Sequence, residues 1–133
     1  MITQIKKTDY TDEGKGSTYR KNHRSCFKVH KELGPGFNEK VYHNALKLLF
    51  DKEALRYQSG KEFEVFFLDK KVGSFRTDLV VENEVILEIK SLVGNIPGIF
   101  EHQLISYLKV SGIHIGLLVN FCNKSCQVKR VVF

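Results

Sequence analysis

Residues 74–90, SFRTDLVVENEVILEIK, contain two apolar runs separated by a polar Glu-Asn-Glu triplet. Branched aliphatic residues on both sides of so short a polar segment predict an antiparallel pair of strands with a three-residue turn. Side chains alternate between the faces of a strand, so matching the apolar sets places Val81 opposite Val85 and Leu79 opposite Leu87. The chain must therefore build a sheet with a covered face. The expected core face carries Phe75, Leu79, Val81, Val85, Leu87 and Ile89.

The rest of the chain switches between helical and strand-like spacing of its apolar residues. Apolar residues that recur at helical spacing predict a helix from about residue 22 to 33 and a second helix that Asn38 can cap and that ends near residue 55. The order α-α-β-β-β-α-β-(β) predicts an α/β fold with a mixed β-sheet flanked by helices. The remaining expected elements are strands over 63–67, 72–82, 85–91, 114–121 and 128–133 and a helix over 99–110.

Length and composition fit a single soluble domain. A chain of 133 residues suits one hydrophobic core. No apolar run approaches the roughly 20 residues of a membrane helix, and the N-terminus has no apolar signal region. Three cysteines, an odd number, provide no disulfide framework. We therefore expect a cytoplasmic protein with no membrane partner.

The basic excess belongs to the N-terminal segment. Residues 1–31 hold eight Lys and Arg against three Asp and Glu, whereas residues 32–133 hold thirteen against twelve. We interpret residues 1–20 as a polar, basic and mobile tail and residues 21–133 as the folded domain. The basic segment could bind a phosphate backbone through counterion release, or it could be a solubilising tail, and both interpretations stay open.

The second face of the strand pair carries charge. The same register places Asp78 opposite Glu88, and Lys90 and Arg76 project from that face as well. Opposed carboxylates lie roughly 5 Å apart at Cβ and destabilise a sheet unless something offsets their repulsion. A divalent cation would do so, since Mg²⁺ takes one or two carboxylates together with waters and substrate phosphate. The alternative is a solvated, charged face without a ligand.

Four separated motifs in this chain resemble one known superfamily. Asp78 followed by Glu88-Ile89-Lys90 resembles the D…(D/E)-x-K signature of the PD-(D/E)XK nucleases, and the order of elements over residues 38–121 is similar to their restriction-endonuclease-like αβββαβ core. Residues 36–42, GFNEKVY, resemble the motif of the GxxExxY family within that superfamily. Gln103-x-x-x-Tyr107 resembles a helix motif of its exonuclease-like branch. Together the motifs span roughly residues 23–133.

The resemblance implies a role for each matching residue. Asp78 and Glu88 would hold Mg²⁺ or Mn²⁺ together with the backbone carbonyl of Ile89, and Glu39 is a further candidate ligand. Lys90 would be the catalytic lysine. The departure from the signature is Thr77, which stands where the proline would be. The full set of candidate catalytic residues is Glu39, Asp78, Glu88, Lys90, Gln103 and Tyr107.

The resemblance therefore implies a metal-dependent nuclease, a hydrolase that cleaves phosphodiester bonds of DNA or RNA. Two other classes of protein stay open: a non-catalytic nucleic-acid-binding module on the same fold, and a partner-binding domain, for example a homo-oligomer. A further protein partner is also compatible with so short a chain. Candidate contacts to nucleic acid are Arg76, Lys109, Arg20, Lys21 and Arg24.

Overall fold

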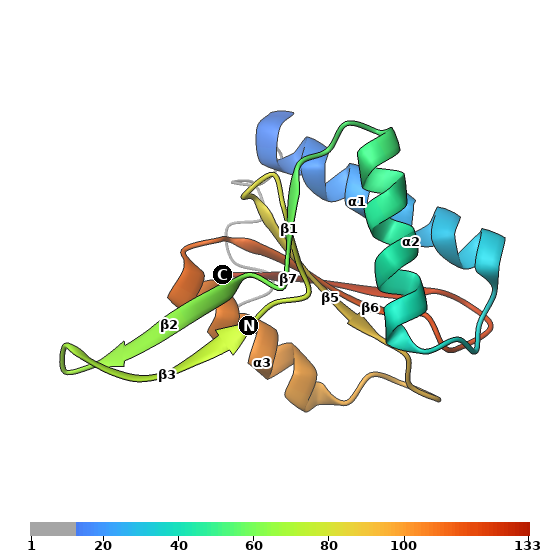
Figure 1. Cartoon of the computed structure of the whole chain (residues 1–133). Coiled ribbons are helices and arrows are strands. Elements are labelled where there is room, and N and C mark those ends of the chain that lie inside the picture. Colours follow the sequence, from blue (N-terminus) through green and yellow to red (C-terminus); the bar gives the residue numbers. More distant parts are fainter. Residues whose placement is uncertain (1–12) are drawn as a thin grey trace.

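A computed structural model describes residues 13–133 of the protein. Within this range the chain forms three helices and seven strands, coloured along the sequence in Figure 1. In chain order they are α1 (Glu13–Leu33), α2 (Glu39–Lys52), β1 (Tyr57–Ser59), β2 (Glu62–Phe67), β3 (Lys70–Arg76), β4 (Leu79–Val81), β5 (Val85–Lys90), α3 (Gly98–Ser111), β6 (Ile115–Asn120) and β7 (Gln127–Val132).

Five of these strands form one mixed sheet in the spatial order β1-β4-β5-β6-β7. β5 and β6 run parallel with α3 as the crossover between them, and the other neighbouring strands are antiparallel. β2 and β3 pair only with each other, and this two-stranded ribbon projects from the body of the protein (Figure 1). The architecture is the α/β fold predicted from the sequence, a mixed sheet flanked by helices as in restriction-endonuclease-like proteins.

Helices cover both faces of the main sheet, and the alternation along β5 assigns each residue to a side. Leu87 and Ile89 pack in a core with Tyr42 of α2, whereas Ile86 packs in a second core with Leu104 of α3. Each of these side chains is at most 1% exposed. Burial of one such side chain stabilises the fold by roughly 1.5–3 kcal/mol. The strand order and these two cores fix how β5 presents its remaining side chains.

The predicted register of the β4–β5 hairpin is confirmed. Val81 pairs with Val85 and Leu79 with Leu87. Glu82 and Asn83 complete the turn with φ angles of 53° and 55°. Positive φ is disfavoured for most side chains, and Asn tolerates it better than most. The turn therefore needs support from its surroundings.

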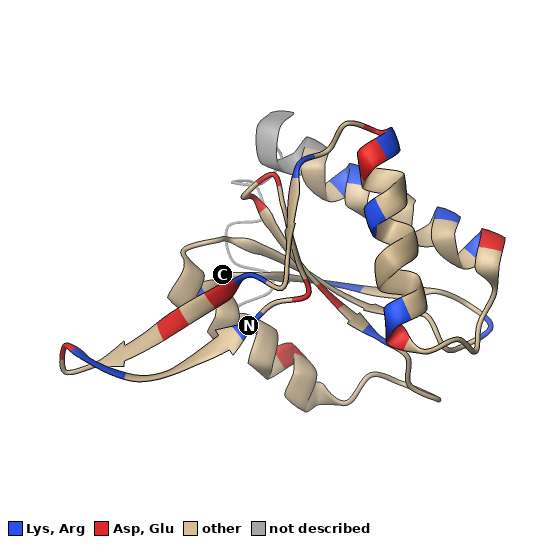
Figure 2. Ribbon diagram, viewed as in Figure 1, with Lys and Arg blue, Asp and Glu red and all other residues tan. Residues whose placement is uncertain are grey.

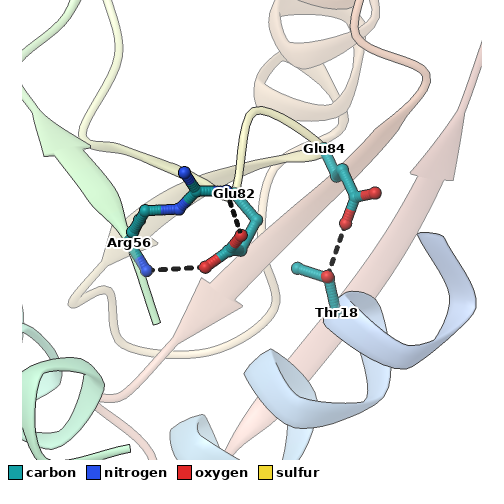
Figure 3. Close-up of polar contacts among 4 residues, drawn as sticks. All are labelled: Thr18, Arg56, Glu82 and Glu84. Atoms are coloured by element: carbon teal, nitrogen blue, oxygen red, sulfur yellow. Dashed lines mark hydrogen bonds and ion pairs between the residues drawn. The ribbon is translucent and has the colours of Figure 1, made fainter. Parts of the chain in front are cut away.

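Contacts from other parts of the chain hold this turn (Figure 3). The backbone N–H of Arg56 donates to Glu82 at 2.7 Å, and the guanidinium of Arg56 lies 3.2 Å from the same carboxylate. The hydroxyl of Thr18 in α1 donates to Glu84 at 2.5 Å. Segments distant in sequence thus anchor both acidic residues of the turn.

The start of α2 is also tied down by specific contacts. Gly34 and Gly36 have φ angles of 76° and 100°, a conformation that glycine adopts without strain. Asn38 is the N-cap, as predicted, and its side chain accepts a hydrogen bond from the first turn. The hydroxyl of Tyr42 donates to the carbonyl of Gly34 at 2.7 Å and accepts from the N–H of Phe37 at 3.1 Å. The tyrosine of the G-x-x-E-x-x-Y segment therefore braces the loop that precedes Glu39.

The expected strand over 72–82 is wrong as a single element. The chain leaves the β2–β3 ribbon at Arg76 and enters the main sheet at Leu79. Between them, the backbone N–H and the hydroxyl of Thr77 both donate to the carbonyl of Lys61, at 2.9 and 3.0 Å. Phe75 is also not on the face of Leu79, because its ring stacks on Tyr107 of α3. Because β3 and β4 pair with different partners, the alternation of side chains between faces does not continue from β3 into β4.

The first helix begins earlier than predicted, and one strand was missed. α1 starts at Glu13, so residues 13–20, which we expected in the tail, belong to a helix, while residues 1–12 lie outside the described residues. Thr18 and Asn22 occupy buried positions of this helix, and polar residues at buried positions hide the apolar period. β1 has only three residues and none of them is buried, so it carries no strand pattern.

Candidate active site

Asp78, directly before β4, and Glu88 of β5 are joined by reciprocal hydrogen bonds at the open end of the hairpin, away from its turn. The backbone N–H of Asp78 donates to Glu88 Oε2 at 2.9 Å, and the backbone N–H of Ile89 donates to Asp78 Oδ2 at 2.7 Å. Each carboxylate thus uses one oxygen to hold the strand that carries the other. Within residues 13–133 no further hydrogen bond engages Asp78 Oδ1 or Glu88 Oε1. The second oxygens remain available to a ligand.

Glu88 is a buried carboxyl group that resists ionisation. It shares the parity of Ile86, so it points to the α3 side of the sheet, and it is 6% exposed. Burial and, next, the charge of Asp78 raise the pKa of Glu88 from 4.5 to about 8. The hydrogen bond from Asp78 and the charge of Lys90 oppose this shift. A second negative charge here is therefore unfavourable until a cation offsets it.

Lys90 follows Glu88 on the same face but does not pair with it. Its Nζ lies 4.0 Å from the centroid of the Phe100 ring in α3, a cation–π contact. The ion pairs of the described chain, Arg56–Glu82 and Lys71–Glu64, do not include it. The ammonium group is thus held beside the carboxylates without neutralising them.

Tyr107 of α3 faces the two carboxylates from across the sheet surface. Its ring stacks on Phe75 with the centroids 4.1 Å apart and the planes 3° from parallel. Burial raises the pKa of Tyr107, and the charges of Glu88 and Asp78 add to the shift. Gln103 lies one turn earlier on the same helix face and is exposed. No hydrogen bond in the described range joins Gln103 to the carboxylates.

Glu39 approaches the site from the first turn of α2. The charge of Glu39 is among the smaller causes of the raised pKa of Glu88, so the two carboxyl groups interact electrostatically without direct contact. The hydroxyl of Ser91 donates to the carbonyl of Phe37 at 2.6 Å and fastens the end of β5 to the loop before α2. A shallow cleft opens there, lined by Gly36, Phe37, Asn38, Glu39, Lys40, Ser91 and Cys122.

His43 is a residue near the site that the sequence analysis missed. It lies one turn after Glu39 on α2, and its Nε2 is 3.2 Å from the hydroxyl of Ser59 in β1. Burial lowers the pKa of His43, while the charge and the backbone of Asp78 oppose the shift. The ring is therefore next to Asp78. The i, i+4 spacing from Glu39 was the signal that could have found it.

The candidate nucleic-acid contacts lie in three different places. Arg76 ends β3, close in sequence to Asp78, and its guanidinium donates to Gly60 at 3.4 Å. Lys109 is in the last turn of α3, with its Nζ 5.6 Å from the ring centroid of Phe133. Arg20, Lys21 and Arg24 are on α1, which belongs to the opposite face of the sheet from Glu88. The structure does not bring these α1 side chains to the carboxylates.

The donor set fits a hard divalent cation that brings water and substrate as its other ligands. Two adjacent carboxylates with free oxygens are what Mg²⁺ or Mn²⁺ takes from a protein. Within residues 13–133 no three His, Cys, Asp or Glu side chains gather closely enough to hold a metal by themselves. The Ile89 carbonyl and Glu39 stay predicted ligands. In the same range no helix is long and apolar enough to cross a membrane.

Comparison with known proteins identifies the family. The sequence matches the family model described as the PD-(D/E)XK nuclease superfamily over residues 17–131. Three chains of solved structures match, among them the crystal structure of SSO0001, with a TM-score of 0.58 and 19% identity over 70% of this chain and 48% of that one. No curated protein matches.

The similarity to SSO0001 shows the fold alone, and this chain spans about half of its length. Membership of the narrower GxxExxY family stays a prediction. The family match, however, covers all of the main sheet apart from the end of β7, and it includes Asp78, Glu88 and Lys90. On this basis the chain belongs to the PD-(D/E)XK nuclease superfamily, whose members generally use divalent metal ions.

Proposed function

We propose that this protein is a metal-dependent nuclease that hydrolyses phosphodiester bonds of DNA or RNA. The observation that carries the proposal is the reciprocal pair of Asp78 and Glu88, whose carboxylates each accept a backbone N–H from the other's strand, at 2.7 and 2.9 Å, and neither of which belongs to an ion pair within residues 13–133. A structural ion pair would have placed Lys90 between them. Instead the arrangement leaves two adjacent carboxyl groups whose full ionisation a bound metal ion would favour.

Each residue has a distinct task in this proposal. A bound Mg²⁺ or Mn²⁺ supplies a Lewis acid for the scissile phosphate and makes water more acidic. Asp78 and Glu88 bind the ion, with the Ile89 carbonyl and Glu39 as further ligands. Lys90, whose Nζ lies over the Phe100 ring, would face the negative charge that develops on the phosphate.

Residues of α3 orient the substrate rather than react with it. Tyr107 is fixed by its stack on Phe75, so its hydroxyl has a defined position relative to the carboxylates. Gln103 is exposed one turn away and would contact the sugar-phosphate backbone. Lys109 and Arg76 add positive charge along the path of a bound strand, and the basic N-terminal segment strengthens non-specific attraction.

The direct test is cleavage of labelled single- and double-stranded DNA and RNA with Mg²⁺, with Mn²⁺ and with EDTA. Wild type is compared with Asp78→Asn, Glu88→Gln and Lys90→Met. Glu32→Gln is the matched control, because Glu32 is exposed on α1 and its replacement removes the same charge. We expect metal-dependent cleavage by wild type and by the control and none by the three site variants.

Calorimetric titration with Mn²⁺ measures metal binding independently of cleavage. The proposal expects binding by wild type and by Lys90→Met, which keeps both carboxylates, and loss of binding in Asp78→Asn. Absence of both cleavage and metal binding in pure wild type would overturn the proposal.

A further inference from the structure

The tip of the β2–β3 ribbon is an apolar surface that folding does not explain. The two strands project from the body of the protein (Figure 1), and neither strand contains a buried residue. Exposed apolar side chains of this size normally pack against something when they cluster. Four of them gather here: Phe66 is 59% exposed, Phe67 67%, Leu68 79% and Val72 62%.

The turn at this tip is strained as well as apolar. Leu68 and Asp69 have φ angles of 51° and 62°. Two-residue turns with positive φ at both positions favour Asn-Gly, and a leucine in this conformation is disfavoured. Leu68 therefore contributes neither burial nor good turn geometry. A strained residue that is also exposed and apolar points to a function outside folding.

The base of the ribbon is fastened to the candidate active site by stacked rings. Phe63 of β2 stacks on Phe75 of β3 with centroids 5.3 Å apart, and Phe75 stacks on Tyr107 at 4.1 Å. The charges of Glu88 and Asp78 in turn contribute to the raised pKa of Tyr107, so Tyr107 lies near both carboxyl groups. A strand bound at the carboxylates would therefore lie beside the ribbon, whose position relative to the site is fixed by this stack.

The charge of the ribbon is compatible with a polyanion. Residues 61–76 contain four Lys or Arg and three Asp or Glu, on a chain with a net charge of +6. Figure 2 shows acidic residues along β2 and both signs of charge at the tip. The carboxylate of Glu64 is offset by Lys71 at 3.1 Å. Lys71 is thus already engaged by Glu64, so Lys70, which follows Asp69, is the lysine beside the apolar tip that a passing phosphate would meet.

The shape of the tip favours nucleic acid over a protein partner. Aromatic side chains have areas of roughly 150–250 Å², so four partly covered apolar side chains expose less than the roughly 800 Å² that each partner buries in a stable protein interface. A two-stranded ribbon is narrow enough to enter the major groove of a duplex. Phe and Leu are also among the side chains that DNA-bending proteins insert between base steps, in their case from the minor groove.

We infer that the β2–β3 ribbon is a wedge that opens duplex nucleic acid by inserting Phe66, Phe67 and Leu68 between neighbouring bases. The inference rests on the proposed function, which supplies nucleic acid as the substrate. The wedge narrows that substrate to a duplex or to a junction of single and double strands. The six residues of β2 span about 20 Å at about 3.3 Å per residue. For a duplex that runs along the ribbon from the carboxylates, the bases that the tip unstacks would lie about six steps of 3.4 Å from the cleaved bond.

The test uses duplexes that carry 2-aminopurine, a base whose fluorescence rises when it is unstacked, at successive positions. Full-length Asp78→Asn protein binds them without cleavage. We expect a rise in fluorescence at positions about six steps from the cleavage site that wild type uses. The rise should disappear when Phe67→Ser and Leu68→Ser are added and persist with Leu48→Ser. Leu48 on α2 is the matched control, since it is 71% exposed.

Cleavage by the otherwise wild-type Phe67→Ser/Leu68→Ser protein gives a second readout. Duplex cleavage should fall by about tenfold or more, because unstacking must then occur unaided, while cleavage of single strands should be little changed. Leu68→Gly separates strain from function: it should raise the melting temperature of the protein and still lose the fluorescence signal.

The outcomes distinguish this inference from the proposed function. If wild type cleaves duplexes but the fluorescence stays flat at all positions, the wedge is overturned and the nuclease stands. If fluorescence rises at any position and depends on Phe67 and Leu68, but wild type cleaves no substrate, the wedge stands and the nuclease is overturned. Sedimentation that shows a dimer of wild type and a monomer of Leu68→Ser would also overturn the wedge, since the tip would then be an interface between copies.

Discussion

The β4–β5 hairpin and the β2–β3 ribbon are both antiparallel strand pairs closed by tight turns, yet their surroundings are opposite. β4 is buried at every position and β5 at all but the last, whereas β2 and β3 have no buried residue. Both turns hold non-glycine residues at positive φ. Contacts from Arg56 and Thr18 support the turn of the buried hairpin. Positive φ in a turn therefore does not by itself indicate a function outside folding. Positive φ in a turn that lacks supporting contacts does.

The same comparison applies to their acidic residues. Glu64 on the ribbon is exposed and forms an ion pair with Lys71. Glu88 in the hairpin is almost completely buried and belongs to no ion pair of the described chain. Neutralising substitutions at Glu64 and Glu88 should therefore have different effects. The following experiments test that difference, beginning with the largest expected effect.

Replacement of a hairpin carboxylate should reduce activity far more than replacement of a ribbon carboxylate. Asp78→Asn or Glu88→Gln is expected to lower the rate of phosphodiester cleavage by about a thousandfold or more, because a metal ion supplies several kcal/mol of transition-state stabilisation. Glu64→Gln should change the rate little. Single-turnover cleavage assays with Mg²⁺ measure both. Equal losses in the two hairpins would contradict the assignment of the site.

The raised pKa of Glu88 predicts the pH dependence of stability in the absence of metal. The unfolded chain releases this proton near pH 4.5, whereas the folded protein keeps it until about pH 8. The free energy of unfolding should therefore fall as the pH rises from about 4.5 to about 8, at up to about 1.4 kcal/mol per unit, and then level off.

Urea denaturation across this pH range measures the effect. Glu88→Gln should remove the decline, because its side chain does not ionise, and Glu64→Gln should keep it. Saturating Mg²⁺ should restore stability most at the alkaline end, where the carboxylate is ready to bind it. A decline of the same size in Glu88→Gln would show that another group is responsible.

Truncation of an apolar side chain should matter in the hairpin and not at the ribbon tip. Leu87 is fully buried and Phe67 is 67% exposed. We expect Leu87→Ala to lower the free energy of unfolding by about 3 kcal/mol. Phe67→Ala should change it by no more than about 0.5 kcal/mol. Chemical denaturation of both variants is the measurement, and a large loss in Phe67→Ala would mean that the tip packs against the protein.

The smallest expected effect concerns the support of the hairpin turn. The side chain of Arg56 is 88% exposed, and the pKa of Glu82 is lowered first by the hydrogen bond from the backbone N–H of Arg56. Arg56→Gln keeps that N–H, so it should cost at most about 0.5–1 kcal/mol, with the difference shrinking at high salt. Denaturation at two ionic strengths tests this. A larger, salt-independent loss would mean that the side chain supports the turn by packing.

Local patterns predicted a large part of the fold. The spacing of apolar residues around Glu82–Glu84 was sufficient for the register of Val81 with Val85, because a shift by one residue would expose the whole apolar set. Asn38 indicated the start of α2 because an N-cap is a local feature. The opposition of Asp78 and Glu88 followed from the same register, and their hydrogen bonds agree with it.

Features that depend on contacts between distant segments could not be read in this way. A strand that changes partner looks continuous in sequence, so the break at Thr77 was invisible until the carbonyl of Lys61 was seen to accept both of its hydrogen bonds. Buried Thr18 and Asn22 concealed the first half of α1. His43 gave no strong signal because its neighbours, Ser59 and Asp78, come from other elements.

The amino-acid sequence by itself determined most of the helices and strands, the register of the central hairpin and the pair of carboxylates at its end. Periodicity and turn chemistry are local, and a few residues suffice to express them. Only the tertiary structure decided that Glu88 is buried and its pKa raised, that Lys90 rests on Phe100 instead of pairing, and that the β2–β3 ribbon leaves the main sheet. Burial, electrostatics and the choice of strand partner all depend on which distant side chains arrive at the same place.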